Sequence, residues 1–163
     1  MPVSTDILRS YRAPRAVIRS LRGDRREARI LVYLMLACSL IFVAQWPRLA
    51  RQAQASDAIP LEALLSGALF AWIFVAPLVF YALGGVLALV LRLARPVEGF
   101  TVRLALFWAM LVASPLALLQ GLTVGMIGPG AAAAATGAAM ALAFVVVLVA
   151  GLRVALEAPT AGA

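Results

Sequence analysis

The sequence predicts an all-α integral membrane protein: a bundle of four transmembrane helices with an N-terminal amphipathic helix at the membrane interface. Three observations predict this class: the apolar content, the long stretches without charge and the uneven distribution of arginine. Of the 163 residues, 64% are hydrophobic, whereas soluble domains are about 45–50% apolar. All 14 basic residues are arginine, and eight of them precede residue 30. Such an apolar excess does not fit a water-facing fold.

The predicted spans follow from the uncharged stretches, since a crossing helix needs about 20 apolar residues. Residues 30–47, 63–91 and 104–152 carry no charge, and they are 18, 29 and 49 residues long. The third stretch holds two crossings, separated by the turn Gly128-Pro129-Gly130. A transmembrane domain of residues 28–157 is therefore expected before a tail at 158–163, with spans at about 28–47, 62–92, 102–126 and 131–153.

The second uncharged stretch leaves two interpretations. Its 29 residues would extend about 43 Å as a helix, which is long for one crossing and too short for two crossings with a turn. One tilted or kinked helix is favoured over a re-entrant hairpin. Pro77 and the pair Gly84-Gly85 are the predicted bend points.

The arginines predict the orientation, because cytoplasmic loops carry an excess of basic residues. The N-terminal segment and the connection after the second span are basic, and Arg153 follows the last span. The first loop on the other side is neutral, because its two arginines are matched by two acidic residues: Arg48, Arg51, Asp57 and Glu62. With an even number of spans, both termini are predicted to be cytoplasmic.

The N-terminal arm, residues 1–27, has an apolar stripe at helical spacing: Ile7, Tyr11, Pro14, Ile18 and Leu21. Four arginines each follow a stripe residue by one position and so lie about 100° around the helix. They are the predicted lipid contacts: Arg12, Arg15, Arg19 and Arg22. A helix in the headgroup region has this layout, with guanidinium groups on lipid phosphates. The alternative is that these arginines only fix topology.

The arm is also predicted to form two short helices, because Pro14 suits the first turn of the second one. Nucleic acid is not an expected partner, since a basic segment beside a membrane span is more often a lipid contact. Anionic headgroups are the expected ligands.

Polar side chains inside the spans are few, and Gln120 is the one strongly polar residue deep in the apolar region. An interhelical hydrogen bond is favoured for it over a substrate contact. Gly121 and Gly125 form a GxxxG pattern, which permits close helix approach and predicts that the third and fourth spans pack together. Ser114-Pro115 predicts a kink whose freed carbonyl groups need local partners.

The sequence lacks several of the residue types that enzymes commonly use for catalysis. The chain contains no histidine or lysine, which removes the commonest general base and the usual amine nucleophile. The single cysteine, Cys38, lies in an apolar run and is expected to be a small buried residue. We therefore predict no catalytic, cofactor-binding or metal-binding residues, and a protein that is not an enzyme.

Two stretches resemble short bacterial members of the Yip (Ypt/Rab-interacting protein) family: Tyr11–Arg15 and Arg103–Leu111, the latter running on to Ser114-Pro115 and Gly121. The family's multi-span membrane proteins include eukaryotic trafficking factors that bind GTPases, but their Asp-Leu-Tyr-Gly-Pro signature is absent here. The resemblance implies a bacterial inner-membrane location and a membrane-protein class without an assigned activity. It also implies five spans, unless this member is shortened.

The function expected from these features is that of a non-enzymatic inner-membrane protein, an accessory or organising subunit. It would act through helix packing and through contacts with anionic lipid, a partner membrane protein or a second copy of itself. The alternative is a small oligomeric transporter or channel component, which usually shows buried ionisable groups in its spans.

Overall fold

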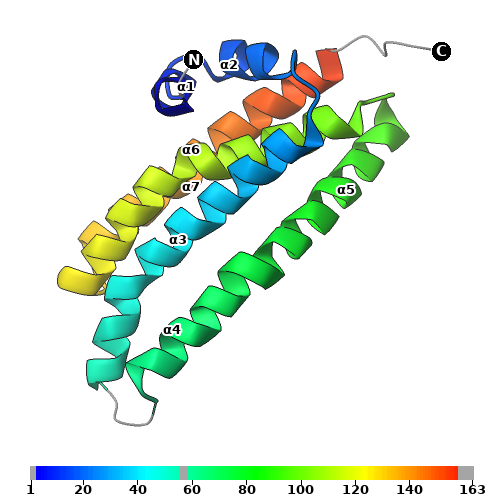
Figure 1. Cartoon of the computed structure of the whole chain (residues 1–163). Coiled ribbons are helices and arrows are strands. Elements are labelled where there is room, and N and C mark those ends of the chain that lie inside the picture. The colour runs from blue at the N-terminus through cyan, green and yellow to red at the C-terminus, as the bar shows by residue number, and fades with distance from the viewer. Residues whose placement is uncertain (1–2, 56–58, 158–163) are drawn as a thin grey trace.

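The computed structural model describes residues 3–55 and 59–157, and every regular element within them is helical (Figure 1). The elements are α1 (Val3–Ser10), α2 (Pro14–Leu21), α3 (Glu27–Ala55), α4 (Leu61–Phe70), the π-helical segment η1 (Ala71–Val75), α5 (Ala76–Ala94), α6 (Gly99–Met126) and α7 (Ala131–Glu157). The predicted all-α class is confirmed.

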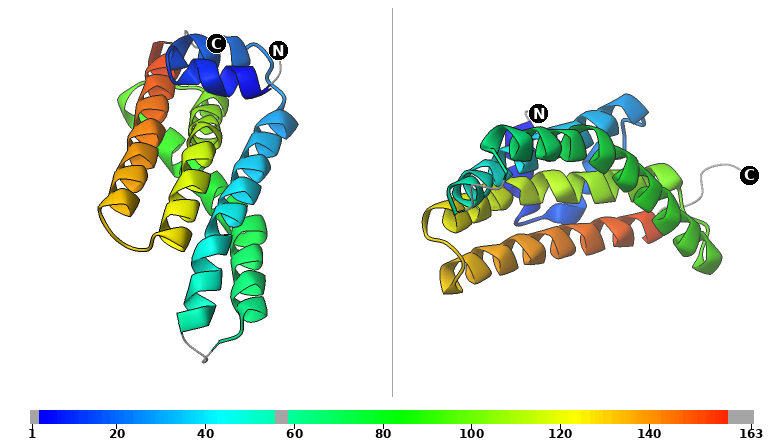
Figure 2. Two further views of the ribbon diagram at one scale, coloured as in Figure 1. Left: turned by 90° about the vertical axis from the view of Figure 1, so that its left-hand side faces the viewer. Right: turned by 90° about the horizontal axis from the view of Figure 1, so that it is seen from below.

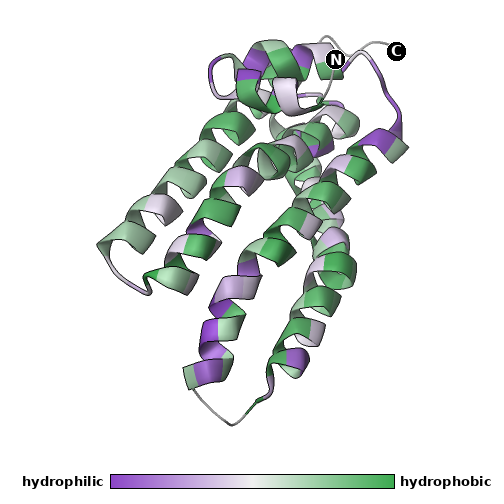
Figure 3. Ribbon diagram, turned by 60° about the vertical axis from the view of Figure 1, so that its left-hand side comes forward, coloured by the Kyte–Doolittle hydropathy of each residue, from purple (hydrophilic) through white to green (hydrophobic). Residues whose placement is uncertain are grey.

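Four of the helical segments are long and apolar enough to cross a membrane: α3, the continuous segment α4–η1–α5, α6 and α7. They are 29, 34, 28 and 27 residues long. Hydrophilic residues gather mainly at the two ends of the bundle and in the N-terminal arm (Figure 3). The predicted number of spans is therefore confirmed within the described residues. We call the end that carries α2 and the start of α3 the arginine-rich end.

The second span is one helix and not a hairpin, with an irregular π-helical segment at Ala71–Val75. Pro77 lies in the first turn of α5, directly after this segment. Proline has no N–H and its ring crowds the preceding turn, and a widened turn is one way to accommodate both effects. Gly84, the other predicted bend point, instead allows close packing, because a Cβ atom there would lie 3.0 Å from Cγ of Arg103.

The first span is longer than predicted, because α3 continues through Pro47 to Ala55. A charged residue indicates where a helix leaves the lipid, but the helix itself can continue beyond that point into water. Arg51 shows what the extension does: its Nη1 donates to the carbonyl groups of Val124 and Gly125, at 3.3 and 3.4 Å. These are end carbonyls of α6, which lack helical donors. The chain then turns at Gly128, which has a φ of 97°.

Helix α6 is the centre of the molecule. Its residues from Gly99 to Ser114 are buried, except for the partly exposed Arg103. It packs most extensively on α3 and α7, and also on α5 and α1. Seen from below, α6 lies between α7 and the α4–η1–α5 helix (Figure 2). Aromatic pairs join α6 to its neighbours, with ring centroids 5.0 Å apart for Tyr33–Trp108 and 4.9 Å for Tyr81–Phe107.

The topology predicts the accessibility of single cysteines in a Cys38→Ala background, in intact cells. Gln54→Cys and Ala132→Cys, both exposed at the end opposite the arginine-rich end, should share one labelling pattern with a membrane-impermeant maleimide. Arg26→Cys and Pro96→Cys, exposed at the arginine-rich end, should share the opposite pattern. A split within either pair would contradict four spans.

Candidate functional site

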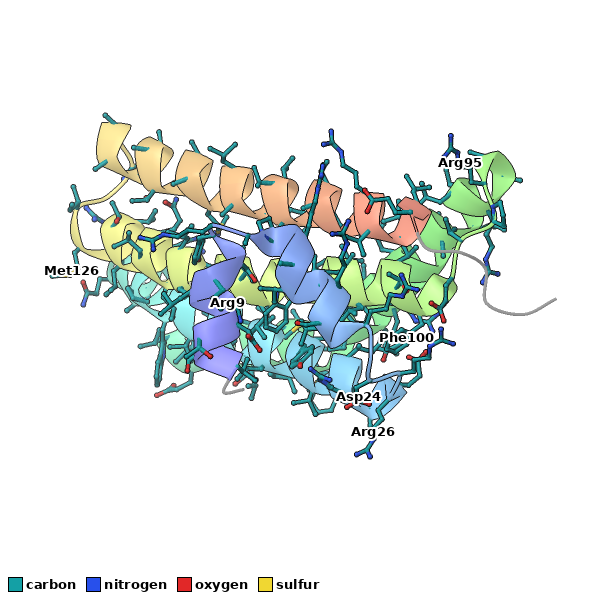
Figure 4. The ribbon with its side chains drawn as sticks, turned by 90° about the horizontal axis from the view of Figure 1, so that it is seen from above. Arg9, Asp24, Arg26, Arg95, Phe100 and Met126 are labelled. Atoms are coloured by element: carbon teal, nitrogen blue, oxygen red, sulfur yellow. The ribbon has the colours of Figure 1, made fainter. Side chains whose placement is uncertain are left out.

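The N-terminal arm is packed on the bundle. Its two helices lie across α6, with α1 against α6 and α2 against α7 (Figure 4). The division of the arm at Pro14 is as predicted. Ile18 and Leu21 of the apolar stripe lie in the core of the bundle and are 0% and 4% exposed. This part of the stripe therefore faces protein and not the lipid that an isolated helix in the headgroup region would contact. Gly151 of α7 leaves the necessary space, because a Cβ atom there would lie 2.9 Å from Cδ1 of Ile18.

A set of hydrogen bonds fixes the arm beside the proline in α6. Pro115 cannot donate to the carbonyl group of Leu111, and the Ser114 hydroxyl donates to that carbonyl instead, at 2.8 Å. The next carbonyl, that of Val112, accepts a hydrogen bond of 2.5 Å from the Tyr11 hydroxyl. The bond from Ser114 to Leu111 is the kind of local partner that the sequence predicted, whereas the bond from the arm to Val112 was not predicted.

A second hydrogen bond supports this contact. Trp108 Nε1 donates to Oγ of Ser10 at 2.9 Å, and both residues are buried. Burial also raises the pKa of Tyr11 above its ordinary value, so the hydroxyl remains protonated and can donate. The arm is therefore anchored by polar bonds at the end of α1 and by apolar packing along α2.

Between the arm and α7 lies a cleft of about 680 Å³, which we call the arginine cleft. Such a volume is within the usual range for ligand pockets, about 300–1,000 Å³. Its apolar wall on α7 consists of Val145, Val146, Val149 and Ala150. Four arginines line it as well: Arg12, Arg15, Arg19 and Arg153.

Little negative charge opposes these arginines. Arg19 forms an exposed ion pair with Glu157 at 2.6 Å, while Arg12, Arg15 and Arg153 pair with no carboxylate among the described residues. Four guanidinium groups and one carboxylate leave a formal charge of +3. The acidic groups Asp24, Glu27 and Glu98 are committed elsewhere at this end, in ion pairs with Arg29, Arg103 and Arg25.

Three of the four predicted lipid-contact arginines thus meet in one cleft, and Arg22 does not line it. Arg22 is the C-cap residue of α2, one turn beyond Arg19, where the chain turns towards α3. Sequence reasoning treated Arg153 only as a topology residue. The feature that could have indicated its role is its position: it ends the uncharged stretch of 49 residues, on the same side of the membrane as the arm.

The predicted packing residues lie on α6, but they face two different helices. Gln120 accepts a hydrogen bond from the Thr136 hydroxyl of α7, which is the interhelical bond expected of it. Gly121 and Gly125 instead face α3, where a Cβ atom at either position would collide with the backbone of Ala44 or with Pro47. The inference that this GxxxG pattern packs the third span on the fourth is therefore wrong. The two spans do pack together, but by other residues.

The four apolar spans, with a basic arm folded onto them, define a multi-pass helical membrane protein. Comparisons of the chain with protein-family models, with curated proteins and with solved structures find no match.

The docking of the arm predicts the effect of Ile18→Ala. Removing a fully buried isoleucine side chain costs about 2–5 kcal/mol, so the arm should separate from the bundle more often. Amide hydrogen exchange of residues 3–21 should then become faster. Leu8→Ala is the control, because Leu8 is 69% exposed and such surface changes are worth about 0.5 kcal/mol or less. Equal exchange in both variants would contradict the docking.

The packing of α6 on α3 predicts that Gly121→Ala lowers the thermal unfolding midpoint in detergent. The added methyl group meets the backbone of Ala44, and overpacking costs about 1–3 kcal/mol. Gly67→Ala and Gly85→Ala are matched controls within helices, since nothing lies within 4 Å of a Cβ atom at either position. They should keep the midpoint or raise it. A midpoint for Gly121→Ala equal to that of the controls would exclude a tight α3–α6 contact.

Proposed function

We propose that this protein is a non-enzymatic subunit of a bacterial inner membrane, with an accessory or organising role, and that it binds an anionic phospholipid in the arginine cleft. In this proposal the arginine-rich end faces the cytoplasm, and the cleft receives a lipid of the cytoplasmic leaflet. The observation that carries the proposal is the convergence of Arg12, Arg15 and Arg153 on an apolar wall. None of the three forms an ion pair with a described carboxylate, and the nearby Glu157 offsets only part of their charge.

The chemistry of the cleft favours a lipid over a soluble anion. Guanidinium groups bind phosphate oxygens through paired hydrogen bonds, and basic pockets between transmembrane helices bind the headgroups of anionic lipids. Below the arginines, the exposed face of α7 continues with Val149, Val145 and Leu142. A phosphate at the arginines would therefore have its acyl chains over an apolar surface.

We also propose that the chain is a shortened member of the Yip family. In support, the two stretches that carry the resemblance, Tyr11–Arg15 and Arg103–Leu111, lie close together, since each bonds to the residue directly beside the other. Trp108 donates to Ser10, and Tyr11 donates to Val112. Residues that bond to each other are expected to be retained together, which would explain why the similarity is concentrated in these two distant stretches.

An accessory role is supported by the α4–η1–α5 helix. Only 17% of its most apolar stretch is buried, and it exposes a series of large side chains that includes Phe70, Phe74 and Leu78. Small residues and polar contacts usually hold transmembrane helices together, and this face of large apolar side chains is not used for packing within the bundle. It is therefore available to lipid or to a partner membrane protein.

The lipid proposal is tested with the full-length protein in nanodiscs of phosphatidylcholine that contain increasing fractions of phosphatidylglycerol. Thermal stabilisation by the anionic lipid should be saturable. Changing Arg12, Arg15 and Arg153 together to Gln should weaken the apparent affinity by about two orders of magnitude at low salt, because each arginine is worth about 1 kcal/mol near an anionic surface. The effect should fade at 1 M salt, where screening acts within about 3 Å.

The matched control removes the same charge at the same end. Arg22, Arg26 and Arg95 lie outside the arginine cleft, and in Figure 4 Arg26 and Arg95 point away from the bundle. Changing these three residues to Gln should preserve most of the stabilisation. If both triple variants lose it equally, the arginines act as a diffuse surface charge, and the cleft has no specific role.

A further inference from the structure

A second hollow lies in the membrane-spanning part of the bundle, away from the arginine cleft. It consists of two neighbouring lobes of about 350 and 360 Å³, floored by α6 and walled by α3, η1 and α7. The lobes share the lining residues Ile41, Trp72, Ala117 and Met140. They are therefore adjacent parts of one groove, which we call the intramembrane groove.

The intramembrane groove is polar at one end and apolar at the other. The first lobe reaches Gln45, Arg48 and Gln120, at the end opposite the arginine-rich end. The second lobe reaches Phe80, Met110 and Phe144, and its surface is almost wholly apolar. This gradient is that of an amphiphile, with one head group and one hydrocarbon tail.

The dimensions also suit a hydrocarbon chain. Along α6, the lining residues run from Met110 to Val124, which corresponds to about 21 Å at 1.5 Å per residue. One leaflet contributes about half of the roughly 30 Å hydrocarbon thickness. The groove can therefore hold an extended chain over the full depth of a leaflet.

Its polar end has donors available for an anion. Arg48 is exposed and forms no ion pair with a described residue. Gln120 accepts from Thr136 through Oε1, but its Nε2 donates to no acceptor in the described part of the chain. Trp46 lies two residues from Arg48 and is 51% exposed, and tryptophan is enriched at the membrane–water interface. The donors thus stand where a head group would lie.

The π-helical segment carries Trp72, the residue of the second span that lines both lobes. Trp72 belongs to η1, and a π-turn changes the direction of the side chains that it carries. Such segments occur frequently at functional sites. Here the segment brings an indole ring to the junction of the polar and apolar lobes.

We propose that the intramembrane groove binds a long-chain fatty acid or a closely similar single-chain amphiphile with a carboxylate head. The carboxylate would accept hydrogen bonds from Arg48 and the Gln120 amide, and the chain would pass Trp72 towards Phe80 and Phe144. This site is separate from the arginine cleft in position, and it requires no lipid to be bound there.

The experiment uses tryptophan quenching by 9,10-dibromostearate, added in increasing amounts to the protein in phosphatidylcholine nanodiscs at a pH where the carboxylate is ionised. Trp108 is fully buried and serves as constant background. In Trp46→Phe, which reports Trp72, quenching should saturate at a low mole fraction, and unlabelled stearate should reverse it. In Trp72→Phe, which reports the lipid-exposed Trp46, quenching should rise in proportion to the quencher without saturating.

Two pairs of variants in the Trp46→Phe background locate the site. Arg48→Gln should weaken binding about tenfold, as expected for loss of a charged hydrogen bond, while Arg95→Gln at the other end should leave it unchanged. Ala141→Phe should abolish saturable quenching by filling the apolar lobe, which Ala141 lines. Ala139→Phe, an exposed position on α7 that lines neither lobe, should preserve it.

The reversal by stearate also tests the head group. Stearyl alcohol should compete at least tenfold less well than stearate, and lysophosphatidylglycerol should not replace it. Proportional quenching of Trp72, or saturable quenching that survives both Arg48→Gln and Ala141→Phe, would overturn the proposal and leave ordinary membrane lipid in the groove. Stronger competition by lysophosphatidylglycerol than by stearate would overturn the carboxylate assignment.

Discussion

The structure depends on the enclosure of α6. Of its most apolar stretch, 72% is buried, against 33% for α3, 28% for α7 and 17% for the second span. Three other spans cannot surround a central helix on all sides. The arm covers the remaining side of its first half, around Trp108 and Val112, whereas Leu119 and Leu122 further along stay exposed. The contact lies beside Pro115. The Ser114 hydroxyl bonds to the Leu111 carbonyl, which the proline leaves without a helical donor, and the Tyr11 hydroxyl bonds to the neighbouring carbonyl of Val112. The polar anchor of the first helices thus lies next to the proline of α6, at Trp108 and Val112.

The arginine cleft follows from that docking by helix geometry. The stripe and its arginines differ by one position, or about 100° around the helix. Once Ile18 faces Gly151, the neighbouring guanidinium groups must point along the surface of α7, towards its exposed valines. Arg153 lies one turn beyond Val149 on the same face of α7 and completes the set. On an isolated arm lying on the membrane surface, the same arginines would face lipid headgroups. In the structure they face α7 instead, because the arm is docked on the bundle.

The spans could be predicted because charge is costly in lipid, and the turn at Gly128 could be predicted because glycine readily adopts a positive φ. The partners of the packing surfaces could not be predicted. The stripe at Ile18 is equally suited to lipid and to protein, since both are apolar. Gly121 and Gly125 indicate that some helix comes close, but their spacing does not distinguish α3 from α7. The end of α3 was missed for a different reason: Arg51 bonds to carbonyl groups 73 and 74 residues away.

The loose attachment of the second span explains why the intramembrane groove exists. Lipid tails are as apolar as leucine, so no hydrophobic force draws a transmembrane helix onto its neighbours. The α4–η1–α5 helix approaches α6 closely at Gly84, where Arg103 and Leu106 are the nearest side chains, whereas Trp72 and Phe80 border open space. In a membrane this space fills with hydrocarbon in any case. Selectivity therefore depends on the polar end, where Arg48 and Gln120 would favour a chain that carries an anionic head over one that does not.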